Sequence, residues 1–317
     1  MKQVDVAVVG AGPAGIAAAL AAASAGARTA LIDEQPVVGG SLRWRVASIG
    51  ELPGTFRDLN GLPGVRLASA LGERLSATTV EVTTSGVAWG WFEGNVLGLL
   101  GPSGASELQA GSIVVASGST DRMAPFPGST LPGVMTARAL LIFLHLHRVF
   151  PGRRFAVVGS GTDAAEVADA IGSAGAEVVC RADSVEGLWV EGGGRVTQVE
   201  FAGASHEVDC VVVALGRQPD PALVLQALAE NILLPEVGGF VPYRGPNCET
   251  SAANIYVAGD AAGIVSDAEA VAEGHLAGLA AAHASAEQIA AARAELDALR
   301  GSERRATLDR LRLKVGA

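Results

Sequence analysis

The sequence predicts an α/β fold with two domains, each built around a parallel sheet, and three observations lead to this fold class. The chain has 317 residues, 49% of them hydrophobic and 18% charged, which provides enough apolar surface for two buried cores. A unit of strand, glycine turn, helix and strand occupies residues 3–33 and occurs again at 154–182. Three further apolar runs end at small residues, as buried strands of a parallel sheet often do.

The composition excludes several classes of protein. The net charge is −10, and an acidic surface repels the phosphates of nucleic acids, so we expect no nucleic-acid partner. The three cysteines, Cys180, Cys210 and Cys248, lie far apart and form no CxxC pair. This pattern fits a reduced, cytoplasmic protein and excludes a disulfide scaffold or a tetrathiolate metal site. The histidines show no ligand spacing either, so we expect no metal.

The first unit begins with the apolar run QVDVAVV at 3–9, which is typical of a buried parallel strand. The glycine turn GAGPAG fills 10–15, a strong helix former follows at 16–25, and a second buried strand is expected at 28–32. This apolar stretch also resembles a membrane or signal segment, but its glycines and proline favour strand, turn and helix. We therefore expect no spanning or targeting segment.

The turn of the first unit has the spacing of a dinucleotide-binding motif. Gly10 allows the tight turn, Gly12 lets the backbone approach a pyrophosphate, and Gly15 lets the helix pack closely on the strand. The positive end of the helix then faces the phosphates. Asp33, 23 residues after Gly10, is placed to accept hydrogen bonds from a ribose diol. The sequence thus predicts a Rossmann-like dinucleotide site.

The second unit has the same order, with GSGTDA at 159–164, but it lacks the acid at the end of its second strand. The stretch before residue 211 holds one hairpin and is too short for a crossover helix and a third parallel strand. We therefore leave two alternatives open, a working nucleotide site or a relic. A working site would favour NADP, because Arg181 can face a 2′-phosphate. The candidate residues are Gly159, Gly161, Thr162, Asp163 and Arg181.

The remaining segments complete the two domains. Residues 55–110 are expected to be mainly β, because alternating runs are separated by turns such as GLPG and FEGN. The buried runs that end at small residues are 113–118, 211–216 and 255–260. A small-residue helix is expected at about 267–284. The polar tail at 285–317 is expected to be helical, either docked on the surface or binding a partner.

A third motif, TSAANIYVAGDAAG, occupies residues 250–263. Its strand ends at Gly259 and Asp260, which puts a carboxylate at the carboxyl edge of a sheet, where ligands bind. The helix that follows is placed to aim its first N–H groups at an anionic ring.

These motifs, in this order, resemble those of the pyridine nucleotide–disulfide oxidoreductase superfamily of FAD flavoproteins. The resemblance covers nearly the whole chain. It implies FAD at the first repeat, with Asp260 contacting its ribityl or phosphate region, and a nicotinamide nucleotide, NAD(P), at the second repeat. The FAD-binding residues expected from the motifs and the resemblance are Gly10, Gly12, Pro13, Ala14, Gly15, Asp33, Glu34, Gly39, Gly40, Ser41, Ala116, Ser117, Gly118, Gly259, Asp260 and Ala268.

A narrower resemblance is carried by DEQPVVGGS at 33–41 and PFPGSTLPGVMTA at 125–137. These segments are similar to flavoprotein subunits of amine and amino-acid dehydrogenases, including opine oxidase, hydrogen cyanide synthase, proline dehydrogenase and the sarcosine oxidase alpha chain. The resemblance implies that Gly39 and Gly40 lie against the isoalloxazine. The chain departs from the disulfide reductases, because 39–50 and 121–135 contain no cysteine. It also lacks the C-terminal cysteine cluster that binds iron–sulfur centres in many amine-dehydrogenase relatives.

Together these observations predict two three-layer, Rossmann-like dinucleotide-binding domains, the second inserted in the first and reduced. The FAD domain is expected at 1–120 and 245–317, and the reduced NAD(P)-binding-like domain at 121–244. The expected function is that of an electron-transferring flavoprotein subunit of an amine or amino-acid dehydrogenase complex, a hetero- or homo-oligomer. One alternative is a self-contained NAD(P)H-dependent flavin reductase that passes electrons to a quinone or ferredoxin-like acceptor. Another is a non-catalytic nucleotide-binding scaffold. No catalytic side chain is predicted, because a flavin carries the hydride chemistry itself.

Overall fold

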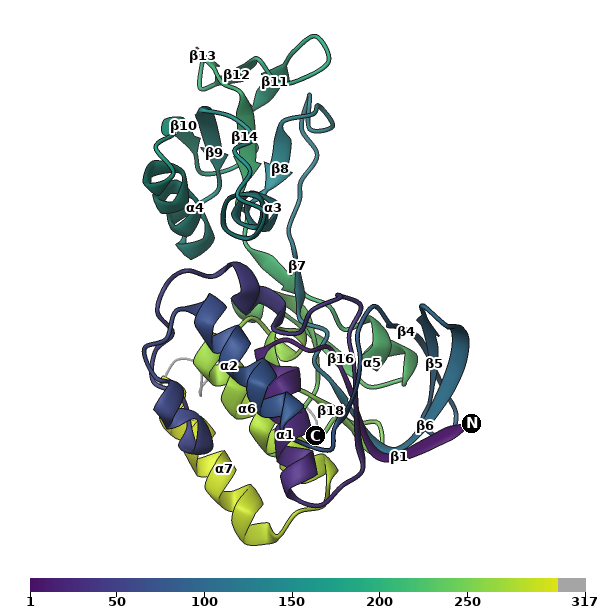
Figure 1. Ribbon diagram of the computed structural model, residues 1–317. Coiled ribbons are helices and arrows are strands. Elements are labelled where there is room, and N and C mark those ends of the chain that lie inside the picture. The colour runs from purple at the N-terminus through teal and green to yellow at the C-terminus, as the bar shows by residue number, and fades with distance from the viewer. Residues whose placement is uncertain (302–317) are drawn as a thin grey trace. The chain divides into compact units, whose positions relative to one another are not determined.

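The computed structural model describes residues 1–301 and separates into two compact units (Figure 1). Unit 1 comprises residues 1–119 and the chain from 219 onward, and unit 2 comprises residues 120–218. Unit 2 is thus inserted in unit 1, as the sequence predicted. The return to unit 1 occurs at residue 219, whereas the sequence predicts it at 245. The two crossings of the chain, β7 (Ser119–Asp121) and β15 (Arg217–Pro219), pair with each other.

A seven-stranded sheet forms the centre of unit 1. Its parallel part has the order β3-β2-β1-β6-β18, and the antiparallel strands β5 and β4 extend from the first half of β6. In the register of this sheet, Val8 of β1 pairs with Leu31 of β2 and with Val114 of β6. The strands are β1 (Lys2–Val9), β2 (Thr29–Ile32), β3 (Glu81–Thr83), β4 (Val87–Phe92), β5 (Val96–Gly101), β6 (Gly104–Val115) and β18 (Ile255–Val257).

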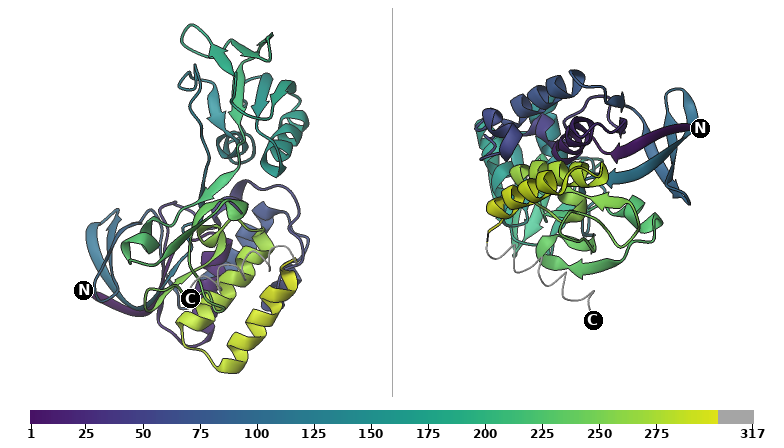
Figure 2. Two further views of the ribbon diagram at one scale, coloured as in Figure 1. Left: turned by 180° about the vertical axis from the view of Figure 1, so that it is seen from behind. Right: turned by 90° about the horizontal axis from the view of Figure 1, so that it is seen from below.

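Two layers cover the faces of this sheet, as Figures 1 and 2 show. Val6 and Val8 of β1 pack against the helices of one face, while Ala7 packs into the cluster of the other face. This alternation is expected of a strand that is buried on both sides. The long helices are α1 (Pro13–Ser24), α2 (Gly64–Ser76), α6 (Asp267–Ala281) and α7 (Ala286–Leu299), and the short 3₁₀ turns are η1 (Gly40–Trp44), η2 (Gly54–Leu59) and η5 (Gly259–Ala262).

The segment 219–244 belongs to unit 1 because its apolar residues bury there. Leu223 and Val224 of α5 (Ala222–Gln226) pack in one cluster with Ile113 and Val115 of the central sheet. A short hairpin, β16 (Asn231–Leu234) and β17 (Gly239–Pro242), joined by η4 (Pro235–Val237), follows α5. These long-range contacts leave no local pattern in the sequence, which is why the predicted boundary differs.

The expectation of a mainly β segment at 55–110 is wrong for its first third. Helix α2 occupies Gly64–Ser76, with Leu67, Leu71 and Leu75 buried along one side. This spacing of four residues is that of a helix with one apolar face. The turn signals ELPG and GLPG, which precede the helix in the sequence, led to the wrong prediction of strands.

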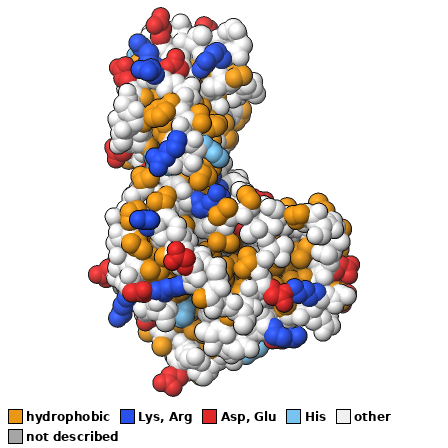
Figure 3. Space-filling model, viewed as in Figure 1, with side chains coloured by type: hydrophobic (Ala, Val, Ile, Leu, Met, Phe, Trp, Pro, Cys, Tyr) orange, Lys and Arg blue, Asp and Glu red, His pale blue; other side chains and the backbone are white. Residues whose placement is uncertain are grey.

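The antiparallel meander β4-β5-β6 carries several exposed hydrophobic side chains, and Figure 3 shows hydrophobic atoms on this part of unit 1. Trp89 and Phe92 are exposed and make an edge-to-face contact. The free edge of β4 is covered by Gln226, which accepts from the Trp91 N–H at 2.9 Å and donates to the Trp89 carbonyl. A side-chain amide thus occupies hydrogen-bonding groups that another strand would use.

Unit 2 contains a parallel sheet of order β10-β9-β14-β8 and a separate antiparallel sheet, β11-β12-β13. Val211 and Val213 of the parallel sheet pack against Val190 and Val199 of the antiparallel one. The parallel strands are β8 (Val134–Thr136), β9 (Arg154–Val158), β10 (Glu177–Ala182) and β14 (Cys210–Val213). The remaining elements are β11 (Trp189–Glu191), β12 (Gln198–Phe201), β13 (Ala204–Glu207), α3 (Ala137–Leu141), the π-helical η3 (Ile142–Leu146) and α4 (Thr162–Ser173).

Unit 2 is a reduced version of the first domain, as the sequence predicted. Strand β10 lies at the edge of its parallel sheet, and the chain between β10 and β14 forms only the antiparallel sheet. The crossover helix and third parallel strand of a complete half are absent from this stretch.

The predicted helical tail is seen in part. Helix α7 ends at Leu299, and the remainder of that prediction, including Leu308, Leu311 and Leu313, lies outside the described residues. Within residues 1–301, no helix combines the length and apolar character needed to cross a membrane. No group of three metal-binding side chains occurs in the same range.

Candidate dinucleotide site

The residues predicted for the first site follow four neighbouring strands of unit 1. Residues 10–15 come after β1, residues 33–41 after β2, residues 116–118 after β6 and residues 259–268 after β18. Because these strands are parallel, their carboxyl ends meet at one edge of the sheet, where ligands bind in open α/β folds.

The glycine turn after β1 is packed too tightly for side chains at two positions. A Cβ on Gly10, whose φ is +100°, would lie 2.2 Å from the Ala116 carbonyl oxygen. A Cβ on Gly15 would lie 1.7 Å from the Gly10 carbonyl oxygen. Both glycines therefore hold the turn against its neighbours, the roles that the motif assigns to its first and third glycines.

Gly12 differs from its neighbours, because its Cα faces open space. A Cβ there would meet only the Gly40 Cα, at 4.0 Å, and Gly12 has an ordinary φ of −75°. Gly12 is also the N-cap of α1, and no side chain caps this helix. Gly39 donates its N–H to the Ala11 carbonyl at 2.7 Å, which holds the 39–41 segment beside the turn. The result is a cradle of backbone atoms at the positive end of a helix.

Asp33 ties the end of β2 to the glycine turn. One carboxylate oxygen accepts from the Ala11 N–H and the other from the Gln35 N–H, the latter at 2.7 Å. Each oxygen has a second lone pair, so the carboxylate can still accept hydrogen bonds from a ribose. The neighbouring Glu34 is exposed.

Gly259 and Asp260, which follow β18 and are called the GD motif below, lie against the start of α1. A Cβ on Gly259 would be 2.8 Å from the Ala14 Cβ. The Asp260 carboxylate accepts from the Ser119 hydroxyl at 2.8 Å and from the Val265 N–H at 3.1 Å. Ser119 was not predicted as a site residue, although it comes directly after the predicted run Ala116, Ser117 and Gly118. In that run, the Ser117 hydroxyl donates to the Asp220 carbonyl at 2.7 Å.

The segment after Gly40 is linked to the start of α6. Arg45, which ends η1, forms an ion pair with Asp267 at 3.3 Å, and Asp267 is the first residue of α6. The predicted residue Ala268 is the next along the helix and is half-buried. Ser41 lies in η1 itself. The structure thus brings the predicted segments of the first site to one edge of the sheet, and Ser119, Arg45 and Asp267 make polar contacts beside them.

The second glycine turn is less complete. Gly159 is as crowded as Gly10, because a Cβ there would lie 1.9 Å from the Ala214 carbonyl oxygen. Gly161 is the uncapped N-terminus of α4 and faces open space, next to Thr162. However, Asp163 in the first turn of α4 pairs with Arg217 at 3.7 Å, and Arg181 on β10 is exposed. The helix start is therefore available, but the acid at the end of β10 that would bind a ribose is missing.

A buried cluster of charges beneath the GD motif was not predicted. Glu273 on α6 is fully buried, and its carboxylate pairs with Arg244 at 2.6 Å and with Arg300 at 2.8 Å. Arg300 also pairs with Glu269 at 3.0 Å. Burial opposes the charge of Arg244, but the facing Glu273 outweighs it and raises the Arg244 pKa. The sequence does contain a signal, since Glu273 lies at helical spacing from the buried Ala270 and Leu276.

The three cysteines are free, and each lies in surroundings that disfavour its thiolate. Burial raises the pKa of Cys248 to about 12 and that of Cys210 to about 11, and it also raises the pKa of the half-buried Cys180. Because the thiolate is the reactive form, we expect Ellman's reagent at pH 8 to titrate at most one thiol, Cys180, in the native protein. All three should react in denaturant. Rapid reaction of two or more native thiols would contradict these environments.

Comparisons with known proteins identify the family of this chain. The family described as pyridine nucleotide-disulphide oxidoreductase matches residues 4–188, more than half of the chain. The chain therefore belongs to this family of FAD-dependent oxidoreductases, and FAD is its cofactor.

Two curated relatives and one solved structure show which kinds of protein this chain is similar to. The alpha chain of sarcosine oxidase from Rhizobium meliloti is 34% identical, over 62% of this chain and 21% of its own length. A component of opine oxidase from Agrobacterium tumefaciens is 28% identical, over 87% of this chain and 65% of its own length. The crystal structure of L-proline dehydrogenase from P. horikoshii matches with a TM-score of 0.80 and 26% identity, over 93% of this chain and 59% of that one. The chain thus spans less than two thirds of each of these relatives.

Proposed function

We propose that this chain is the electron-transferring flavoprotein subunit of an amine or amino-acid dehydrogenase complex. The observation that carries the proposal is the inequality of the two repeats. The first combines a crowded glycine turn, an open Gly12, the acid Asp33 and the GD motif at one edge of the sheet. The second lacks the ribose-binding acid and the third parallel strand. A chain of this kind binds FAD well and is poorly equipped to receive electrons from a nicotinamide nucleotide.

The chain's own residues fit FAD by the chemistry of their groups. The N–H groups at the uncapped start of α1 and the space in front of Gly12 suit a pyrophosphate, and Asp33 suits a ribose. Asp260, held by Ser119 and Val265, suits a hydroxyl-bearing chain between pyrophosphate and ring. When bound, FAD supplies a two-electron acceptor. Burial raises the pKa of the Cys210 and Cys248 thiols and so disfavours thiol–disulfide exchange at both, which argues against disulfide reduction.

The similarity to components of sarcosine oxidase and opine oxidase supports an amine or amino acid as the electron donor, with the donor reacting on a partner subunit. The similarity to an L-proline dehydrogenase supports the same donor class. A cytoplasmic location is part of this proposal, in keeping with the reduced cysteines.

The alternative is a self-contained NAD(P)H-dependent reductase. The open, uncapped start of α4 at Gly161 and the exposed Arg181 favour it, because both suit a phosphate-bearing ligand. A non-catalytic scaffold, the remaining possibility from the sequence, would bind the nucleotide and transfer no electrons.

Anaerobic bleaching of the flavin distinguishes these functions. We expect the purified yellow protein to keep its visible absorbance when NADH or NADPH is added, and to bleach with dithionite. In a separate sample that is still oxidised, an amine or amino-acid donor added together with the partner subunit should also bleach the flavin. Rapid bleaching by NADPH or NADH alone would contradict the proposal and favour the reductase. Failure to bleach with any donor in the assembled complex would favour the scaffold.

A further inference from the structure

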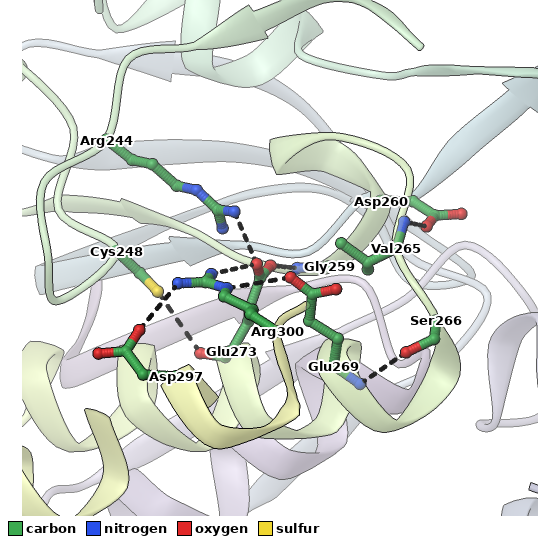
Figure 4. A network of polar contacts seen from close by, with 10 residues as sticks. All are labelled: Arg244, Cys248, Gly259, Asp260, Val265, Ser266, Glu269, Glu273, Asp297 and Arg300. Carbon is green, nitrogen blue, oxygen red and sulfur yellow. Dashed lines mark hydrogen bonds and ion pairs between the residues drawn. The ribbon is translucent and has the colours of Figure 1, made fainter. Parts of the chain in front are cut away.

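The buried charges beneath the GD motif are arranged around one carboxylate. Figure 4 shows Arg244, Arg300 and the Gly259 backbone N–H all directed at Glu273. One oxygen of Glu273 forms the ion pairs with Arg244 and Arg300, and the other accepts from the Gly259 N–H at 2.9 Å. Glu273 is 0% exposed, so none of these contacts is weakened by solvent.

A buried carboxylate of this kind has a cost that must be balanced. Removing it from water is unfavourable, and pairing with two arginines that are 5% and 7% exposed compensates for it. Glu269 supplies a second negative charge to Arg300 at 3.0 Å. An ion cluster whose only role was stability could be replaced by apolar side chains. The hydrogen bond to Gly259 is the feature that an apolar replacement could not reproduce.

The contact with Gly259 connects the cluster to the proposed FAD site. Gly259 has a φ of +69° and immediately precedes Asp260, whose carboxylate is held by Ser119 and Val265. Gly259 also abuts Ala14 in the first turn of α1. The next residue after Glu273, Gly274, packs on the Ala14 backbone, since a Cβ there would lie 2.0 Å from its carbonyl oxygen. Glu273 therefore sits where α6, the GD motif and the start of α1 meet.

We propose that Glu273 is a positioning residue for the FAD site. Its carboxylate fixes the Gly259–Asp260 peptide against the start of α1, and Arg244 and Arg300 keep that carboxylate ionised and in place. Arg300 follows the end of α7, so the same contact couples the last described helix to the cofactor site. This inference rests on the FAD site of the proposed function, and it concerns residues of the chain that lie outside the motifs that predicted that site.

The test compares two double variants with equal charge. Glu273→Met with Arg300→Met, and Glu273→Gln with Arg300→Met, both remove one acid and one base. They differ in that the glutamine oxygen can still accept from the Gly259 N–H. The readouts are the dissociation constant of FAD for each apoprotein, from the quenching of flavin fluorescence, the visible circular dichroism of bound FAD, and the melting temperature of each apoprotein.

We expect the methionine double variant to bind FAD at least about tenfold more weakly than the glutamine double variant and to change the visible dichroism. The glutamine variant should stay close to the wild-type protein in FAD affinity and visible dichroism. Both double variants should melt at a lower temperature, because the buried Arg244 loses the charge of Glu273. Equal affinities and equal spectra in the two double variants, with or without a common loss of melting temperature, would show that the cluster is structural only. Failure of the wild-type apoprotein to bind FAD would instead overturn the site assignment itself.

A single variant keeps the test decisive if the methionine double variant does not fold. Glu273→Asp preserves the charge for both arginines but draws the carboxylate back by one methylene from the Gly259 N–H. We expect this variant to bind FAD at least about tenfold more weakly while its apoprotein stays folded by far-ultraviolet circular dichroism. Unchanged FAD affinity in Glu273→Asp would overturn the inference.

Discussion

Replacing Gly12 with alanine is expected to remove most FAD affinity while leaving the fold intact. The added methyl meets no protein atom closer than 4.0 Å, and the backbone at Gly12 suits alanine. It does project into the cradle at the uncapped start of α1, where we propose that the pyrophosphate binds. Overpacking a close contact costs about 1–3 kcal/mol, and about 1.4 kcal/mol corresponds to tenfold in affinity. We therefore expect the dissociation constant of FAD to rise roughly 10- to 100-fold.

Two other glycines serve as controls for this experiment. Gly50→Ala adds a methyl in open space outside the site and should leave FAD affinity unchanged. Gly15→Ala forces a Cβ to 1.7 Å from the Gly10 carbonyl oxygen, so it should lose FAD together with stability. The measurements are flavin fluorescence quenching for affinity and circular dichroism for folding. Wild-type affinity in a folded Gly12→Ala protein would contradict the proposed position of the pyrophosphate.

The part of the fold that the sequence predicts best is the part with a local signal. The glycine turns with Gly10 and Gly159 mark the first strand-to-helix connection of each repeat, because the tight approach of backbone to backbone leaves no room for a side chain. The buried parallel strands read as short apolar runs for the same physical reason, since both of their faces are covered. The missing crossover in unit 2 also follows from length alone, and the structure confirms it.

The features that the sequence did not predict depend on contacts between distant residues. Helix α5 returns to unit 1 because Leu223 and Val224 find their core there, which moves the boundary from 245 to 219. Helix α2 has buried leucines at a spacing of four residues, but the turn signals before it suggested strands. The hydrogen bond from Ser119 to Asp260, 141 residues away in the chain, likewise leaves no local signal in the sequence. Glu273 could have been suspected, because Glu269 and Glu273 place two acids one turn apart on a helix that is otherwise rich in small apolar residues.

The largest effect on stability is expected at the crossing of α1 and α6. The two helices approach so closely that a Cβ on Gly278 of α6 would lie 2.2 Å from the Ala18 carbonyl oxygen of α1. Gly278→Ala must push the helices apart, because the contacted atom is backbone and cannot turn away. We expect a loss of about 3 kcal/mol, at the upper end of overpacking costs. For a protein of this size the melting temperature should fall by roughly 5 °C in thermal unfolding.

A matched glycine in another helix of unit 1 separates this effect from helix propensity. A Cβ on Gly72 of α2 would lie 3.4 Å from a Val38 methyl, which is an ordinary contact. Gly72→Ala should therefore be neutral or stabilising by about 0.5–1 kcal/mol.

Gly274, one turn before Gly278, packs on Ala14 in the first turn of α1 instead of on Ala18. Gly274→Ala should therefore lower both the melting temperature and FAD affinity, whereas Gly278→Ala should act mainly on the melting temperature. If Gly278→Ala melted like the wild-type protein, the close crossing would be wrong. If Gly274→Ala kept full FAD affinity, the start of α1 would not depend on α6 for its position.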